Sequence, residues 1–119
     1  MSIRPALRLI PLLLAVGACG TPKPPTHQLT RSQAAIRAAE EVDAEKTPKA
    51  ALHLKMARDN QAAAQQMISA QDQYGEAELA LRRSEADAEV AIALAKEAKA
   101  QAEADEARNK VSRLKKEME

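Results

Sequence analysis

Apolar residues along this chain form one short continuous run near the start and then a long stretch with helical spacing. From Ser32 on, residues of strong helix propensity dominate, above all alanine, and the chain has no phenylalanine or tryptophan. Pro48 and Gly75 are the only helix breakers in that stretch. The pattern predicts an all-α fold with helical segments at about 31–46, 48–71 and 73–118.

The two boundaries between these segments differ in strength. Thr47 is a suitable N-cap, and Pro48 stands at the first helical position, where its missing N–H costs nothing. Asp72 and Gly75 favour a turn at the second boundary, but Gln71 is a poor residue for ending a helix, and one glycine costs a helix only about 1 kcal/mol. The last two segments are therefore either an antiparallel hairpin or one long kinked helix.

Each of the two longer segments carries two neighbouring apolar stripes. In segment 48–71 the first is Leu52, Met56, Ala63, Met67 and Ala70, and the second is Leu54, Ala57, Ala64 and Ile68. In segment 73–118 the first is Ala77, Leu81, Ala88, Ala91, Ala95, Ala98 and Ala102, and the second is Ala86, Val90, Ala93, Ala100, Ala104, Ala107, Val111, Leu114 and Met118. A face this broad suits close packing against two other helices. The stripes predict a three-helix antiparallel bundle or hairpin.

The third segment is longer than the helices on which it can pack, at almost 70 Å against roughly 35 Å for the second. We therefore expect it to protrude from about residue 100. There the apolar pattern narrows to an interaction seam of Ala104, Ala107, Val111, Leu114 and Met118. Such a seam favours a partner helix, from a second copy or from another envelope protein. The alternative is a solvated helix supported by its own charge pairs.

The continuous apolar run ends at Ala18 and has the order of a secretory signal. Arg4 and Arg8 precede it, and the small residues Gly17 and Ala18 stand at its end. The run is too short to span a bilayer, which needs about 20 residues. Cys19, the one cysteine of the chain, comes directly after Ala18, and it has no partner for an intrachain disulfide. Cleavage between these two residues would release residues 1–18.

The sequence Val16-Gly17-Ala18-Cys19 resembles the lipobox of bacterial lipoproteins. This resemblance implies a signal peptide at 1–18 and a mature chain that begins at Cys19, which carries a diacylglycerol and an amide-linked acyl chain such as palmitate. A lipidated, proline-rich tether at 19–31 and a helical domain at 32–119 would follow. Because Gly20 rather than an aspartate follows the cysteine, the resemblance points to the periplasmic face of the outer membrane, with the N-terminal lipid as the membrane contact.

Residues 34–100 resemble an uncharacterised alanine-rich helical domain of bacterial envelope lipoproteins, a domain of unknown function. The shared features are Ala35-Ile36, Ala39-Glu40, Pro48, the run from Leu54 to Asp59, Asp72, Tyr74, Ala77 and Ala86-Asp87-Ala88. Gln71 stands where the family usually has glycine. The resemblance implies a helical bundle in the envelope, but no activity is assigned to that family.

Candidate chemistry is sparse in this sequence. It has no glycine-rich phosphate loop and no GxSxG motif, its two histidines, His27 and His53, stand far apart, and carboxylates such as Glu85 and Glu89 are expected on a solvated face. Removal of residues 1–18 changes the net charge from +1 to −1, and Tyr74 is the only aromatic residue, so nucleic acid is a poor partner. We expect no catalytic residue, metal, cofactor or small-molecule substrate.

These patterns together predict a lipid-anchored helical lipoprotein of the periplasm with a structural or protein-interaction role, and not an enzyme. The alternative is a cell-wall tether in the manner of the major murein lipoprotein. Proteins of that kind end in a lysine that is joined to peptidoglycan. This sequence ends Lys115-Lys116-Glu117-Met118-Glu119, which disfavours the alternative.

Overall fold

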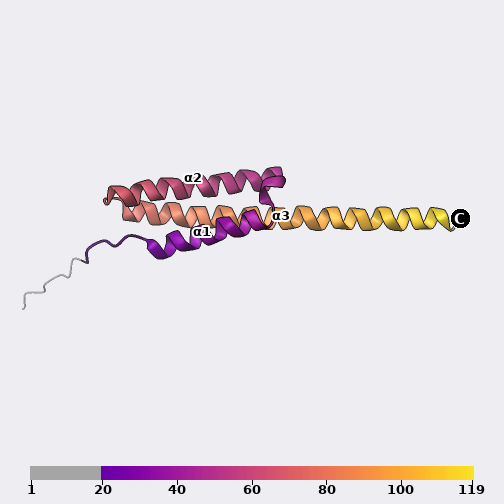
Figure 1. Cartoon of the computed structure of the whole chain (residues 1–119), viewed down its shortest axis with the longest axis horizontal. Helices are drawn as coiled ribbons and strands as arrows, with labels where there is room; N and C mark the ends of the chain where they lie inside the picture. The colour runs from indigo at the N-terminus through magenta and orange to yellow at the C-terminus, as the bar shows by residue number, and fades with distance from the viewer. Residues whose placement is uncertain (1–19) are drawn as a thin grey trace, which may run out of the picture.

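The computed structural model describes residues 20–119; Ala18 and Cys19 lie outside this range. The described chain is all-α, and its elements are α1 (Thr26–Glu41), the short 3₁₀ helix η1 (Ala44–Lys46), α2 (Pro48–Ala70) and α3 (Tyr74–Glu117). Helices α1 and α2 lie along the first half of α3, and α3 continues well past both of them (Figure 1). The predicted all-α fold with a long protruding C-terminal helix is confirmed.

Helix α1 begins at Thr26, so residues 26–31 are helical and do not belong to the tether. Pro25 precedes the helix, and its carbonyl oxygen accepts a hydrogen bond of 3.0 Å from the Leu29 N–H. The Leu29 side chain packs against the core near the α2–α3 turn. The predicted tether boundary at residue 31 was therefore wrong, because this long-range contact stabilises helical turns that local composition does not reveal.

The connection from α1 to α2 is longer than the sequence predicts. Helix α1 ends at Glu41 rather than near residue 46, and Asp43 adopts a left-handed conformation with φ of 58°. Aspartate tolerates this conformation better than most residues, so the chain can turn here without glycine. After η1, Thr47 is extended and Pro48 occupies the first position of α2. Proline suits this position because an N–H there would have no partner within the helix.

Helices α2 and α3 form a hairpin and not one kinked helix. Gln71 follows α2 with φ of 61°, and its N–H donates to the Ile68 carbonyl oxygen over 3.2 Å. A left-handed conformation costs an ordinary residue about 1–2 kcal/mol. Met67 and Ile68 pack across the turn on the core around Leu81. The burial of these side chains outweighs the local cost at Gln71.

The bundle core consists mainly of alanine. Leu54 on α2 and Leu81 on α3 are the largest apolar side chains that are completely buried. Of the two predicted stripes on each helix, the core contains Leu54, Ala57 and Ala64 from α2, and Ala77, Leu81, Ala88, Ala91 and Ala95 from α3. Leu52, Met56 and Val90, from the other stripes, are exposed. Small core side chains let the helices approach closely, and the remaining apolar stripe of α3 stays open to solvent.

One buried polar cluster connects all three helices near the centre of the bundle. The Ser84 hydroxyl donates to the Ala57 carbonyl oxygen over 2.7 Å, so Ser32 donates to Ser84 across 2.8 Å. Gln61 Nε2 donates to Ser32 Oγ over 3.0 Å. Within residues 20–119, no buried side-chain nitrogen or oxygen lacks a partner. A cluster in which every polar group has a hydrogen-bond partner fixes the position of each of the three helices along the bundle axis relative to the other two.

Candidate interaction surface

The second half of α3 has no cover from the rest of the described chain. Ala95 is the last buried residue of the helix, and all residues in 99–119 are exposed. In Figure 1 this part of α3 extends beyond the turn that joins α1 to α2. The expectation that α3 protrudes from about residue 100 is confirmed.

The five residues of the predicted interaction seam lie on one face of this tail. With 100° of rotation per residue, Ala104, Ala107, Val111, Leu114 and Met118 fall within an arc of about 80°. The exposed fraction is 52% for Val111, 49% for Leu114 and 80% for Met118. The helix thus brings the seam together on one open surface. Whether a partner occupies it stays a prediction.

The same exposed face continues back along the bundle. There the exposed apolar residues include Leu79 and Val90, which lie on the side of α3 opposite to buried Ala77 and Ala88. We call the whole line the outer seam, and it consists of Leu79, Ala86, Val90, Ala93, Ala100, Ala104, Ala107, Val111, Leu114 and Met118. The predicted stripe began at Ala86 and missed Leu79. Counting back from Leu114 in steps of seven residues would have found it.

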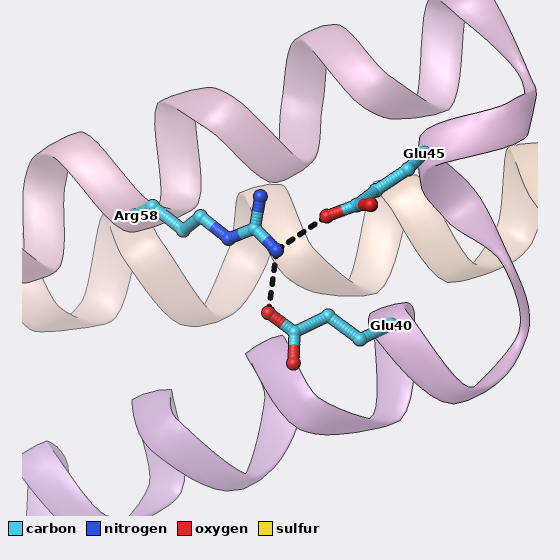
Figure 2. A network of polar contacts seen from close by, with 3 residues as sticks. All are labelled: Glu40, Glu45 and Arg58. Carbon is cyan, nitrogen blue, oxygen red and sulfur yellow. Dashed lines mark hydrogen bonds and ion pairs between the residues drawn. The ribbon is translucent and has the colours of Figure 1, made fainter.

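Arg58 on α2 forms ion pairs with two carboxylates, one on α1 and one on η1. Its Nη2 donates to Glu40 Oε1 on α1 over 2.5 Å and to Glu45 Oε1 on η1 over 2.6 Å (Figure 2). These hydrogen bonds, first to Glu40 and then to Glu45, raise the pKa of Arg58 above its ordinary value. All three side chains are exposed, and such pairs contribute less than about 1 kcal/mol. The cluster holds the α1–α2 connection in place.

Glu85 does not lie on a solvated face, and that expectation was wrong. Only 14% of its side chain is exposed, because α1 packs over it. Arg31 Nη2 lies 2.6 Å from Glu85 Oε1, and Gln28 Nε2 donates to Glu85 Oε2 over 2.6 Å. These contacts join α1 to α3 and further explain why α1 begins as early as it does.

His53 on α2 faces Asp87 on α3, with 3.0 Å between His53 Nδ1 and Asp87 Oδ1. Asn60 Nδ2 approaches the other carboxylate oxygen of Asp87 at 3.4 Å. His27 lies in the first turn of α1, far from this pair in sequence. No group of three His, Cys, Asp or Glu side chains in the described part of the chain is arranged to hold a metal ion. The His53–Asp87 contact joins two helices.

No helix within residues 20–119 combines the length and the apolar character needed to cross a membrane. No family model matches this chain, and comparison with curated proteins and with solved structures gave no match. The resemblance to the alanine-rich envelope lipoprotein domain therefore stays a prediction. The physical features that bear on function are the sequence around Cys19 and the outer seam of α3.

Proposed function

We propose that this protein is a lipid-anchored component of the cell envelope, on the periplasmic face of the outer membrane, with a structural or protein-interaction role and no catalytic one. The observation that carries the proposal is the sequence Val16-Gly17-Ala18-Cys19, at the end of a short apolar run and with the only cysteine of the chain. Acylation of Cys19 with more than one chain gives stable anchoring, whereas a single chain binds membranes only marginally.

The fold supports an anchored interaction role through its dimensions. The segment between Cys19 and the start of α1 at Thr26 is short and contains three prolines, so it favours an extended conformation. At about 3 Å per residue it reaches roughly 20 Å, which keeps the bundle near the membrane surface. The exposed tail of α3 adds a reach of about 30 Å beyond the bundle. Its exposed Val111, Leu114 and Met118 offer a contact surface.

Replacement of the predicted lipidated cysteine tests the anchor. In the Cys19→Ser variant of the full chain, incorporation of labelled fatty acid should be lost, and the protein should leave the outer-membrane fraction or stay as uncleaved precursor. A matched control adds Ser69→Cys, at an exposed position of α2, to the Cys19→Ser chain. This control restores a thiol but should not restore anchoring. Normal processing and outer-membrane fractionation of the Cys19→Ser chain would contradict the proposal.

A further inference from the structure

The outer seam of α3 follows a seven-residue repeat along almost the whole helix. One series of positions, each seven residues from the next, is apolar throughout and consists of Leu79, Ala86, Ala93, Ala100, Ala107 and Leu114. The series between them is Arg83, Val90, Glu97, Ala104, Val111 and Met118. All these residues are exposed. Alternating steps of three and four residues define the a and d positions along which two helices pack as a coiled coil.

A line of charged residues borders the seam and alternates in sign at every step of seven residues. Its members are Arg82, Glu89, Lys96, Glu103, Lys110 and Glu117, and each of them is exposed. These are g positions, where charged side chains select the partner and its orientation. In an antiparallel pair of helices, g positions face g positions. Strict alternation therefore makes this border complementary to an antiparallel copy of itself.

We propose that a second copy of this chain packs antiparallel on the outer seam, with the two-fold axis between residues 98 and 99 of α3. The pairing deepens the interaction role proposed above, but it does not depend on the lipid anchor. Its charge pairs are Arg82 with Glu117, Glu89 with Lys110, and Lys96 with Glu103 of the second copy. Each pair occurs twice by symmetry, so every member of the charged border meets an opposite charge.

The apolar layers of this arrangement are also complementary in size. Ala104 faces Ala93 of the second copy, and Val111 faces Ala86. Met118 faces Leu79 at either end of the seam. Alanine near the two-fold axis lets the helices approach closely there, and larger side chains fill the ends. The pairing extends over about 60 Å of helix.

Charge argues against the competing arrangements. A parallel pair in register would place Arg83 against Arg83 and Glu97 against Glu97 inside the seam. An antiparallel pair shifted by one heptad in either direction would bring like charges together at every pair of the charged border that still forms, and it would leave Arg82 or Glu117 without a partner. A shift by two heptads in either direction restores opposite charges but leaves two members of the border in each chain without partners, Arg82 and Glu89 for a shift toward the C-terminus and Lys110 and Glu117 for a shift toward the N-terminus. The sequence thus selects one orientation and one register.

The bundle leaves room for the second copy. Helices α1 and α2 cover the opposite side of α3, and the buried part of α3 ends at Ala95. In the proposed register Ala95 lies at the same level along the axis as Ala102 of the second copy, which belongs to its exposed tail. The two bundles therefore follow one another along the dimer without overlapping, and the tail of each chain packs on the uncovered side of the other chain's bundled α3.

Crosslinking of full-length chains tests both orientation and register. We would co-express one chain carrying Ala93→Cys with another carrying Ala104→Cys, and treat whole cells with a short, membrane-permeant bifunctional thiol reagent, so that the result does not depend on whether the chain is membrane-bound. These residues face one another in the proposed pair, so a covalent dimer should form. Neither variant alone should give it, because the two copies of residue 104 would lie about 16 Å apart along the axis. The matched control, Ala104→Cys with Ala107→Cys, reports the register shifted by two heptads and should also give no dimer.

Each contrary result has a definite meaning. A dimer from Ala104→Cys alone would show parallel packing, and a dimer from the control pair would show the register shifted by two heptads. Absence of a dimer from Ala93→Cys with Ala104→Cys would exclude the contact between these two residues. Each of these three results overturns the proposal. In the wild-type chain Cys19 is the only cysteine, so this chain shows whether Cys19 alone reacts with the thiol reagent. If it reacts with the reagent, Cys19 carries a free thiol and the lipid anchor fails, while the comparison among the α3 variants keeps its meaning.

Charge reversal tests the border independently of any cysteine. The Glu103→Lys chain places lysine against Lys96 of the second copy at two symmetric positions, and dimer affinity should fall about tenfold. Adding Lys96→Glu restores both pairs with reversed sign, so affinity should return close to the wild-type value. Sedimentation of the full mature chain in detergent measures both variants. Failure of the double variant to recover would show that these charges do not set the pairing, and would overturn the proposed register.

Discussion

The two halves of α3 are both rich in alanine, but they have opposite surroundings, and the second half carries twelve charged residues against seven in the first. In the first half, Ala77, Ala88 and Ala91 are completely buried under α1 and α2, whereas Ala104 and Ala107 in the second half are exposed. Both halves alternate alanine with charged residues, and both continue in one unbroken helix from Tyr74 to Glu117. The alanines of the two halves therefore differ in burial because α1 and α2 cover only the first half, and the larger number of charged residues in the second half suits its exposure to solvent.

The largest expected contrast comes from shortening one leucine in each half. Leu81→Ala removes one of the two largest apolar side chains that are completely buried, so it should lower the free energy of unfolding by about 2–5 kcal/mol. Leu114→Ala changes an exposed side chain and should stay within about 0.5 kcal/mol at concentrations where the chain is monomeric. Urea unfolding followed by circular dichroism measures both. Equal losses would mean that the tail is packed within its own chain.

Enlarging one alanine in each half sharpens the same contrast in the other direction. Ala88→Leu inserts atoms between closely packed helices and should cost about 1–3 kcal/mol. Ala104→Leu extends into solvent in a monomer and should be nearly neutral. Thermal unfolding at low protein concentration distinguishes them. A neutral Ala88→Leu chain would show that the bundle is loosely packed and that the two halves differ less than we describe.

A substitution in the turn between α2 and α3 should stabilise the chain. Gln71 has a positive φ, which glycine adopts without steric cost, so Gln71→Gly should raise the free energy of unfolding by about 1 kcal/mol. Gln65→Gly, at an exposed position inside α2, is the matched control and should lower it by about the same amount. If Gln71→Gly also destabilises the chain in urea unfolding, the hairpin geometry at residue 71 is incorrect.

The smallest effect is expected at the exposed ion pairs of the bundle end. Arg58→Met should cost less than about 1 kcal/mol and should cost less still in high salt, because all three side chains are exposed. The hydrogen bonds to Glu40 and Glu45 raise the pKa of Arg58 above its ordinary value, so the contribution of the charged guanidinium is complete at neutral pH and is lost only as the pH rises through the raised value. The difference in stability between the wild type and the variant should thus be constant between about pH 7 and pH 10. A difference that varies across this range would point to another titrating group.

Sequence reasoning predicted the features that depend on local patterns. The helical composition, Pro48 at the start of α2 and the excess length of the last helix all give direct physical expectations, and the structure confirms them. The sequence alone could not show which of the two apolar stripes of α2 is buried, because Leu52 and Leu54 are the same residue type and only Leu54 lies in the core. The prediction of a lipid on Cys19 and of a partner on the seam stays open.

The missed features all depend on contacts between distant parts of the chain. Leu29 packs near the α2–α3 turn, and Glu85 is covered by Arg31. Both contacts join residues of different helices. Ser32 and Ser84 look like ordinary surface residues in the sequence, but they meet in the core. No local pattern contains these pairs, and so the early start of α1 and the polar cluster could be found only in three dimensions.

Hydrogen exchange of α3 in the mature protein, measured by mass spectrometry at low and high protein concentration, tests the central claim most directly. Amides of residues 77–95 should be protected to the same degree at both concentrations, because α1 and α2 cover them within the chain. Amides of residues 100–117 should exchange fast when the protein is dilute and become protected when it is concentrated, as the second copy covers the tail. Equal protection of the two halves at all concentrations would contradict the account.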